Sequence, residues 1–300
     1  MNQAALRALA DAFGERLARN RPLASYTSTH VGGPAEALLV ARTVADLREV
    51  ARTAWRHGIP LRVLGGGCNV LVSDAGVRGL VVINRAKGIT FEETRVRAES
   101  GAGFGRLARG CIERGLAGLE WAVGIPGTVG GAVIGNAGAH GGGTAGIIEE
   151  VALITPDGER RMDAESLGYE YRSSIIKRER WECVVLTAAF ALQAEVREEL
   201  AARADAYTAH RKATQPPGAT MGSTFKNPPG DYAGRLIEAA RLKGARRGGA
   251  LISPQHANFL INTGGATAQD FMALIDLART EVRARFGVTL ELEIELIGEL

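Results

Sequence analysis

The segment from Trp121 to Ile148 is twenty-eight residues long and contains no aspartate, glutamate, lysine or arginine. An uncharged run of this length is a first indication of a membrane helix, which needs about 20 consecutive apolar residues. Ten of its residues are glycine and one is Pro126, and both residue types oppose helix formation. The sequence therefore excludes a membrane helix here and predicts a backbone that bends sharply or lies close against another group.

Length and composition predict a globular protein of two or three domains, since single cores stop growing at roughly 250 residues and the chain has 300. The first twenty residues carry five or more charges and no unbroken apolar stretch, which argues against a secretory signal. One face of a short amphipathic helix is expected there, formed by Leu6, Leu9, Ala10, Phe13 and Leu17. A cytoplasmic protein without membrane association is expected.

Cysteine, histidine and net charge exclude several classes of site. The three cysteines are widely spread and the five histidines show no metal-ligand spacing, so neither a disulfide framework nor a metal site is expected. A net charge of +3 is too small to indicate nucleic-acid binding. Basic residues do cluster at 241–247 and at 211–212, where either a solvated face or a pocket for an anionic small ligand accounts for them.

Hydrophobic periodicity predicts interleaved strands and helices. Thr43 and Asp46 form a capping box that opens a helix ending near Gly58. Further helices are expected at 104–115, 194–212, 232–242 and 267–286, and strands at 59–64, 69–72, 79–84, 89–100, 151–162, 181–192, 257–262 and 288–298. This pattern is typical of α+β domains.

Two glycine segments, 65–70 and 124–138, are separated by predicted strands that can bring them together. Glycine lets a backbone adopt positive φ and approach a ligand closely, and successive backbone N–H groups form a concave site for phosphate. Tight turns are the simpler explanation of one such segment. Two segments, one nearly uncharged, favour a buried anionic ligand with apolar surroundings, such as a dinucleotide. The Rossmann and Walker A patterns are absent, so loops are expected to hold the phosphates.

Five motifs then follow one another in the order of a known enzyme family. They read LGGGCNVLV, VGIPGTVGGAVIGNAGAHGG, YRSS, GSTFKNP and LELEIELIG. In these motifs the chain closely resembles the UDP-N-acetylenolpyruvoylglucosamine reductases, flavoenzymes that make UDP-N-acetylmuramate for peptidoglycan. The resemblance extends from about residue 22 to residue 298. Without an insertion after YRSS, the chain resembles the compact second type of the family.

The resemblance implies an α+β fold with a FAD-binding domain of the vanillyl-alcohol-oxidase (PCMH) type and a smaller α+β substrate-binding domain. The FAD-binding domain is expected at 1–195, in subdomains of about 1–77 and 78–195, the substrate-binding domain at 196–287, and a returning C-terminal strand at 288–300. FAD is expected to bind non-covalently through Gly65, Gly66, Gly67, Cys68, Asn69, Val70, Gly124, Ile125, Pro126, Gly127, Thr128, Gly130, Gly131, Asn136, Ala137 and Gly138. Cys68 stands where the family usually has serine, which weakens one expected phosphate contact.

The implied reaction has two halves. NADPH reduces the flavin, and the enolpyruvyl ether of UDP-N-acetylglucosamine then receives hydride from flavin N5, which leaves negative charge spread into its carboxylate. Ser223 matches the family's proton donor, and Arg172 matches the arginine that holds the carboxylate, for which a planar bidentate cation is suited. From the residues alone, a serine such as Ser223 is more often a turn or cap residue, and Arg172 reads equally as a surface arginine.

Glu293 is the third catalytic residue that the resemblance implies. Alternation alone places Leu290, Leu292, Ile294 and Leu296 on one face of a strand and three glutamates on the other, and does not choose among the glutamates. The family pattern selects Glu293. Tyr171, Lys226 and Asn227 match substrate-contacting positions, while Thr214 replaces a family lysine, so Lys212 or Arg211 is expected to substitute for it.

Two other functions remain open at this point. A flavin-dependent oxidase of the same fold needs no proton donor such as Ser223, and a non-catalytic sugar-nucleotide or flavin-binding module has no use for Ser223, Arg172 and Glu293 together. Fold alone does not separate the three. The expected partner is a small sugar-nucleotide substrate, and the chain is expected to act as a monomer.

Overall fold

The computed structural model describes residue 1 and residues 3–300, which divide into two compact units. Unit 1 consists of Met1–Ala18, Leu38–Gly66 and Gly79–Arg211. Unit 2 consists of Arg19–Ala37, Gly67–Arg78 and Lys212–Leu300. Both units therefore combine segments that are distant in the sequence.

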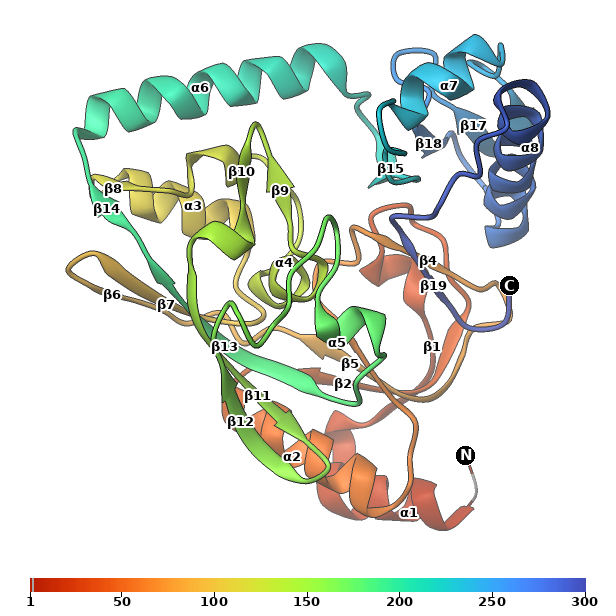
Figure 1. The fold of residues 1–300 in the computed structure, drawn as a ribbon. Coiled ribbons are helices and arrows are strands. Elements are labelled where there is room, and N and C mark those ends of the chain that lie inside the picture. The colour runs from red at the N-terminus through yellow and green to blue at the C-terminus, as the bar shows by residue number, and fades with distance from the viewer. Residues whose placement is uncertain (2) are drawn as a thin grey trace. The chain divides into compact units, whose positions relative to one another are not determined.

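Unit 1 is built on a five-stranded antiparallel sheet in the order β12-β11-β13-β7-β6 (Figure 1). In a second sheet, of order β1-β2-β5-β3, strands β3 and β5 pair in parallel. The helices are α1 (Gln3–Phe13), α2 (Val44–Arg56), α3 (Phe104–Ile112), α4 (Val129–Gly135), α5 (Ile175–Arg178) and α6 (Arg197–Thr214). The strands are β3 (Leu61–Leu64), β5 (Val77–Asn84), β6 (Ile89–Glu92), β7 (Arg95–Glu99), β8 (Leu116–Ala117), β9 (Gly138–Ala139), β10 (Gly142–Gly143), β11 (Ile148–Thr155), β12 (Gly158–Met162), β13 (Val184–Ala191) and β14 (Gln193–Ala194), with β2 (Pro34–Ala41) starting in unit 2.

Local sequence signals place these elements largely where they were predicted. The Thr43 hydroxyl accepts a hydrogen bond from the Asp46 N–H, and the Asp46 carboxylate accepts one from the Thr43 N–H, so the predicted capping box opens α2. Leu9 and Phe13 are buried on one face of α1, as the N-terminal periodicity predicts. β11 and β12 pair tightly around a turn that ends at Gly158, whose φ is +131°.

The core of unit 1 buries part of the uncharged segment. The Trp121 indole packs edge-on against Phe104, with ring centroids 5.6 Å apart, and Phe104 in turn lies 6.5 Å from Phe190 of β13. Val129 and Val133 of α4 join the same core. The lack of charge in this stretch is thus explained partly by burial, since a charged side chain here would lose its hydration.

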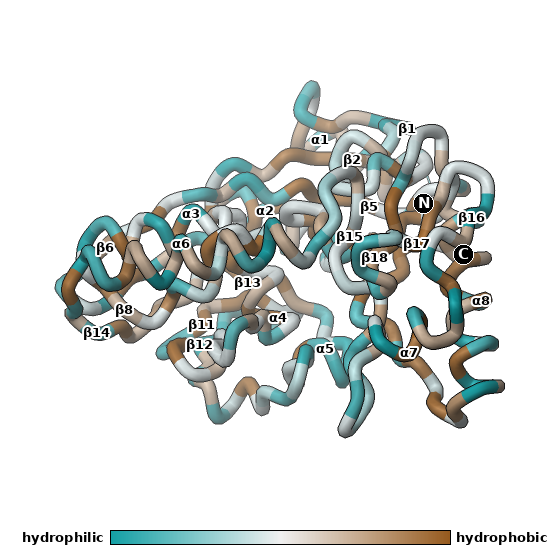
Figure 2. Tube along the Cα trace, turned by 90° about the horizontal axis from the view of Figure 1, so that it is seen from above, coloured by the Kyte–Doolittle hydropathy of each residue, from teal (hydrophilic) through white to brown (hydrophobic). Residues whose placement is uncertain are grey.

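The structure divides the chain near residue 211, whereas the sequence predicts a boundary near residue 195. The difference lies in α6, which places Leu200 and Ala204 in the core of unit 1. Figures 1 and 2 both show α6 beside α3 and β8, and Figure 2 shows hydrophilic and hydrophobic stretches alternating along it. The larger share of charged residues after residue 195 therefore reflects an amphipathic helix of unit 1 and does not mark a domain boundary.

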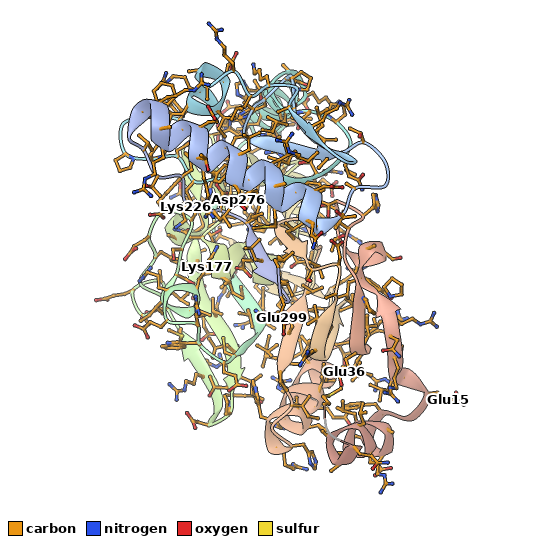
Figure 3. The ribbon with its side chains drawn as sticks, turned by 90° about the vertical axis from the view of Figure 1, so that its right-hand side faces the viewer. Glu15, Glu36, Lys177, Lys226, Asp276 and Glu299 are labelled. Carbon is orange, nitrogen blue, oxygen red and sulfur yellow. The ribbon has the colours of Figure 1, made fainter. Side chains whose placement is uncertain are left out.

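Unit 2 contains a four-stranded antiparallel sheet in the order β15-β18-β17-β16. Its helices are α7 (Ala233–Ala239) and α8 (Ala268–Phe286), and its strands are β1 (Ala18–Pro22), β4 (Val70–Val72), β15 (Ala219–Ser223), β16 (Arg246–Arg247), β17 (Ala250–Ile252), β18 (Phe259–Asn262) and β19 (Glu295–Ile297). Figure 3 shows α8, with Asp276 labelled, crossing this unit. Phe225, Phe271 and Leu236 are among its buried core residues.

The basic cluster of unit 2 lies on exposed surface. Arg246 and Arg247 form the edge strand β16 and are exposed, and Lys243 pairs with Glu238 at 2.8 Å. Charged side chains on an edge strand oppose pairing with another chain. Of the two explanations left open for this cluster, the structure favours the solvated face.

The C-terminal segment is not the continuous strand that its alternation predicts. Leu290 and Ile294 are buried, but Leu296 is 38% exposed and Ile297 is buried in its place. The chain bridges Phe225 at Leu292, bends, and only then joins β4 in parallel as Glu295–Ile297. The prediction that Leu296 lies on the buried face is therefore wrong. The change of partner strand shifts the alternation of buried and exposed residues by one position.

Candidate active site

The two glycine segments meet in unit 1, where Gly65 follows β3 and Thr128 precedes α4. A Cβ atom on Gly65 would overlap the Thr128 Oγ1 atom, so a larger residue would force the threonine to move. Arg85 Nη1 donates a hydrogen bond of 3.3 Å to the Gly65 carbonyl oxygen. The prediction that the intervening strands bring the segments together is confirmed by this contact.

Some glycines of the second segment serve packing. A Cβ atom on Gly130 would lie 3.1 Å from the Cβ of Ser100, and just beyond the segment one on Gly142 would overlap the Trp121 indole. These glycines let the backbone run close against neighbouring protein. The simple explanation by tight packing is therefore correct for this part of the segment.

Other glycines of the segment present bare backbone. A Cβ atom on Gly127 would meet no atom within 4 Å, and one on Gly131 would approach only Thr128 Oγ1, at 3.8 Å. Gly131 is exposed, as are Gly124 and Pro126. The positive φ of Gly124 and Gly127, +78° and +116°, by itself favours glycine there. At Gly131 neither packing nor positive φ explains the residue, whereas close approach of a ligand does. This open backbone surface fits the flat, uncharged part of a flavin nucleotide.

The N-terminus of α4 is already used by the protein. The N–H of Val129 donates to the Ala102 carbonyl at 2.9 Å, and the N–H of Gly130 donates to the Ser100 carbonyl at 2.8 Å. These are two of the four donors that a helix start would otherwise offer to an anion. Their use by the protein makes this helix start a weaker phosphate site, in keeping with the prediction that loops hold the phosphates.

Asn136 and Ala137 shape the end of the glycine segment. Asn136 ends α4 with a φ of +45°, its Nδ2 donates to the Glu170 carbonyl at 2.9 Å, and its Oδ1 accepts from the Ala145 N–H at 3.1 Å. The Ala137 carbonyl accepts from both the N–H and the hydroxyl of Thr144. In the structure these groups fix loops against one another, so a predicted contribution to FAD binding would act through the backbone shape.

The YRSS motif forms a tight turn in unit 1. Glu170 and Ser173 exchange two main-chain hydrogen bonds of 3.0 and 3.1 Å, which leaves Tyr171 and Arg172 at the tip. Arg172 has a φ of +55°, at a turn position where glycine is favoured. Arginine in a left-handed conformation costs free energy, and such strain is concentrated at functional sites.

Contacts of the turn direct Arg172 toward the glycine segment. A Cβ atom on Gly138 would lie 3.3 Å from Arg172 Nη1, and the Ser174 hydroxyl donates to the Ile134 carbonyl at 2.7 Å. The Arg172 guanidinium also lies over the ring of Tyr171, 5.2 Å from its centroid, and Tyr171 is 53% exposed. The structure thus brings one predicted catalytic residue beside the predicted flavin-binding backbone.

The remainder of the first glycine segment belongs to unit 2. Gly67 is buried with a φ of +63°, and a Cβ there would overlap the Tyr26 carbonyl oxygen. The Ser28 N–H donates to the Gly67 carbonyl at 3.0 Å. Cys68 is half-buried and Asn69 is exposed. The packing and hydrogen bond of Gly67 therefore fix the loop, and the next two residues, Cys68 and Asn69, lie nearer the surface.

Ser223 and Glu293, the two predicted catalytic residues of unit 2, lie on neighbouring backbones. Ser223 ends β15, and the next residue, Thr224, accepts a hydrogen bond of 2.9 Å from the Glu293 N–H through its carbonyl. On its other side, the Glu293 carbonyl accepts a hydrogen bond of 3.1 Å from Asn69 Nδ2. Three motifs far apart in the sequence are joined by these bonds.

The contacts of unit 2 distinguish the three C-terminal glutamates. Glu291 has an exposed side chain that pairs with Lys226 Nζ at 3.6 Å. Glu293 is half-buried and lies at the bend where the chain changes partner. Glu295 lies in β19, paired with Val70. Only Glu293 combines partial burial with direct backbone bonding to the segment after Ser223.

The two predicted substrate residues of unit 2 also have structural partners. The Lys226 N–H donates to the Glu291 carbonyl at 2.9 Å, in addition to the side-chain pair. Asn227 Oδ1 accepts a hydrogen bond of 3.1 Å from the N–H of Ala233, the first residue of α7. Lys226 is half-buried and Asn227 is exposed. Their roles in substrate binding remain predictions.

Sequence reasoning assigned no role to Asn258, which the structure places next to Ser223. Its carboxamide bonds the main chain of Phe225, and its own carbonyl bonds Thr224. An asparagine just before an apolar strand reads as a turn residue, so only tertiary contacts reveal it.

Residues 1 and 3–300 contain no group of three or more histidine, cysteine, aspartate or glutamate residues able to hold a metal ion. All three cysteines are free thiols, and burial raises the pKa of Cys111 to about 12 and of Cys183 to about 11. Over the same described part of the chain, no helix is long and apolar enough to cross a membrane.

Comparison with known proteins decides the family. Residues 35–162 match the family model for a FAD binding domain, and residues 213–297 match that for the UDP-N-acetylenolpyruvoylglucosamine reductase C-terminal domain. The UDP-N-acetylenolpyruvoylglucosamine reductase of Rubrobacter xylanophilus is 44% identical over 283 residues, which cover 93% of this chain and 95% of that protein. The chain belongs to the UDP-N-acetylenolpyruvoylglucosamine reductase family.

Further relatives of the reductase family agree with this assignment. The reductase of Geobacillus kaustophilus is 40% identical, over 97% of this chain and 96% of its own length. The crystal structure of the reductase from Thermus caldophilus superposes with a TM-score of 0.81 at 35% identity, covering 93% of this chain and 98% of that one. The predicted family and the predicted α+β fold with a FAD-binding domain are confirmed.

Proposed function

We propose that this chain is an NADPH-dependent FAD enzyme that reduces UDP-N-acetyl-enolpyruvoylglucosamine to UDP-N-acetylmuramate in peptidoglycan synthesis. Membership of the reductase family supports the reaction and its cofactor. The observation that carries the proposal is the bonding around Glu293, whose backbone joins Thr224, directly after Ser223, to Asn69 of the glycine loop. A proton donor and a carboxylate beside a predicted flavin loop are what this reduction requires.

The residues present fit a flavin nucleotide. In unit 1, the open backbone at Gly131 leaves room for a ligand. In unit 2, Cys68 and Asn69 follow the buried Gly67 in the loop that the family resemblance also assigns to FAD. FAD, when bound and reduced by NADPH, supplies the hydride that goes to the terminal alkene carbon of the substrate. The protein has to bind the substrate, stabilise its negative charge and deliver a proton.

The three catalytic side chains divide this work. The Arg172 guanidinium binds the substrate carboxylate through two parallel hydrogen bonds and stabilises the charge that spreads into it. The Ser223 hydroxyl gives its proton to the carbon that bears the ether oxygen; a serine is a weak acid, but an enolate-like carbon is a strong enough base to take its proton. The Glu293 carboxylate assists by polarising the developing charge or by supporting the proton step.

The experiment that tests the proposal is an anaerobic half-reaction. Purified protein would be reduced with stoichiometric NADPH, and the visible flavin band followed after addition of the enolpyruvyl sugar nucleotide. Rapid return of the oxidised spectrum is the expected result. A flavin that stays reduced until air is admitted would indicate an oxidase. Protein that purifies without a flavin band and gains none on incubation with FAD would contradict the proposal altogether.

Replacing Arg172 by lysine is expected to raise the KM for the enolpyruvyl substrate by about 10- to 100-fold, because lysine keeps the charge but loses bidentate bonding. Flavin reduction by NADPH should change little, and both rates are measured by stopped-flow absorbance. The matched control is Arg178→Lys in the neighbouring helix α5, whose guanidinium pairs with Glu170 and donates a hydrogen bond to the Gly168 carbonyl. Equal effects of both substitutions would contradict the role of Arg172.

Arg211 is favoured over Lys212 as the substitute for the family lysine at Thr214. Arg211 is half-buried, lies near Gly124, and burial lowers the pKa of its guanidinium. Within the described residues no carboxylate pairs with it, whereas Lys212 is exposed. The His140 ring stacks on the Tyr207 ring, with the ring centroids 4.3 Å apart, and so fixes this end of α6. A desolvated cation without a protein partner is suited to a phosphate.

We expect Arg211→Ala to raise the KM for the sugar nucleotide by about tenfold, the effect of losing one charge-assisted hydrogen bond. Lys212→Ala is the matched control and should change that KM less than twofold, about the scale of a solvated surface charge. Initial rates at saturating NADPH provide the measurement. If Lys212→Ala has the larger effect, the assignment is reversed.

We further propose that the enzyme works in the cytoplasm as a monomer. Its substrates, a nucleotide sugar and NADPH, support the cytoplasmic location.

A further inference from the structure

We propose that Asn258 is a positioning residue for proton transfer, because its carboxamide fixes the backbone directly after Ser223. The inference rests on the proposed role of Ser223 as proton donor. Asn258 is buried, with 3% of its surface exposed, and it lies just before β18. It would act through the main chain of its neighbours and would not touch the substrate.

Three hydrogen bonds join Asn258 to the two residues that follow Ser223. Its Oδ1 accepts from the Phe225 N–H at 2.9 Å, and its Nδ2 donates to the Phe225 carbonyl at 2.8 Å. Its main-chain carbonyl accepts from the Thr224 N–H at 2.8 Å. Only a side chain that both donates and accepts can replace the missing pair of ladder bonds in this way.

Ser223 needs such support because the sheet is irregular at this point. The pairing of β15 with β18 shifts register between Thr220 and Ser223, and Gly222 between them has a φ of +78°. A break in the ladder loosens the strand end. The amide of Asn258 continues the pairing beyond the break, and the burial of Phe225 anchors the same segment in the core.

The opposite side of this segment bonds the C-terminal segment that carries Glu293. The Glu293 N–H donates to the Thr224 carbonyl, and the Lys226 N–H donates to the Glu291 carbonyl, both at 2.9 Å. Residues 224–226 therefore lie between Asn258 and the C-terminal segment. Loss of the amide would let Ser223 and Glu293 move relative to each other, and proton transfer is sensitive to displacements of about 1 Å.

Asn258 is itself held by a half-buried histidine. Its N–H donates to His256 Nδ1 at 3.2 Å, and the His256 N–H donates to the Ser253 hydroxyl at 3.2 Å. The His256 ring packs edge-on against Phe259, 4.9 Å away. Burial lowers the pKa of His256, which keeps Nδ1 free to accept.

Asn258→Ala tests the proposal against a matched control on the same strand. The side chain of Asn262, at the far end of β18, makes three hydrogen bonds, to Thr29, Gly264 and Ala266, at 2.8 to 3.2 Å. Asn262→Ala removes all three, whereas Asn258→Ala removes the two bonds of its carboxamide and keeps the main-chain bond to Thr224. The control therefore loses at least as many hydrogen bonds, away from Ser223. A purely structural role predicts similar results for both variants.

In the holoenzyme, Asn258→Ala is expected to slow the reoxidation of reduced flavin by the enolpyruvyl substrate by about 10- to 100-fold. Flavin reduction by NADPH and the dissociation constant of the substrate should change less than threefold, within the context-dependent scatter of single contacts. The solvent deuterium isotope effect on reoxidation should rise, because proton transfer becomes slower. Asn262→Ala should leave all four quantities near the wild-type values.

Several outcomes would overturn the proposal. They are equal slowing of both half-reactions, equal behaviour of the Asn258 and Asn262 variants, or an unchanged isotope effect. If Asn258→Ala does not fold, Asn258→Ser, which keeps one polar atom, is judged by the same readouts, and failure of both to fold would show a structural role. Ser223→Ala is measured in parallel: rapid reoxidation in that variant would remove Ser223 from its role, whereas slow reoxidation there with a normal Asn258→Ala would overturn only the present inference.

Discussion

Ser223→Ala is expected to lower turnover of the enolpyruvyl substrate by about 10²- to 10⁴-fold, the usual contribution of a positioned general acid. The methyl side chain has no proton to give, so the carbon that bears the ether oxygen must wait for a proton from water. Flavin reduction by NADPH needs no such proton and should stay nearly intact. Stopped-flow absorbance of the two half-reactions separates these effects.

Thr263→Ala is the control for this test, because it removes a hydroxyl from the same unit at a distance from Ser223. The Thr263 hydroxyl lies just beyond the far end of β18 and donates a hydrogen bond to the Gly249 carbonyl. It should leave both half-reactions unchanged. Normal turnover in Ser223→Ala would remove the serine from catalysis, and loss of both half-reactions would point to a structural fault in the loop.

The second large effect is expected from Gly67→Ala. Gly67 has a φ of +63°, and a Cβ would overlap the Tyr26 carbonyl oxygen. The left-handed conformation and the overlap together should cost at least about 2 kcal/mol. A loss of about 2 kcal/mol corresponds to a fall in melting temperature of about 4 to 8 °C for a domain of about 150 to 250 residues. Thermal unfolding and the flavin content of the purified variant are the measurements.

Gly131→Ala is the contrasting variant for the glycine segments. A Cβ there makes only an ordinary contact with Thr128 Oγ1, at 3.8 Å, so the melting temperature of the flavin-free protein should not fall. Flavin affinity should fall if FAD lies on this open backbone. A destabilised Gly131→Ala, or a Gly67→Ala as stable as wild type, would contradict the division into packing and open glycines.

Many elements of the fold were predictable because their signals are local. The capping box at Thr43 and Asp46, the buried face of α1 and the turn before Gly158 depend on residues within a few positions of one another. The strands around the triple glycine were predictable in the same way. In each case one stretch of chain contains both the signal and the structure that it specifies.

The site was only partly predictable from the sequence. The glycine segments, the YRSS turn and the GSTFKNP motif are recognisable as stretches of sequence, but glycine alone does not reveal whether it packs or lies open. Alternation likewise leaves Glu291, Glu293 and Glu295 equivalent. The structure separates them by the pair between Glu291 and Lys226 and by the backbone bonds of Glu293.

By itself, the sequence determined the longer helices, most strands of unit 1, the two glycine segments and the family motifs, but it did not predict β2 or β15. Only the tertiary structure decided that α6 belongs to unit 1, that the C-terminal strand breaks at Glu293, and that Asn258 supports the backbone after Ser223. The physical reason is the sequence distance over which each interaction acts. Secondary structure follows from periodicity over a few residues, whereas burial and hydrogen-bond partners depend on chain segments that meet only after folding.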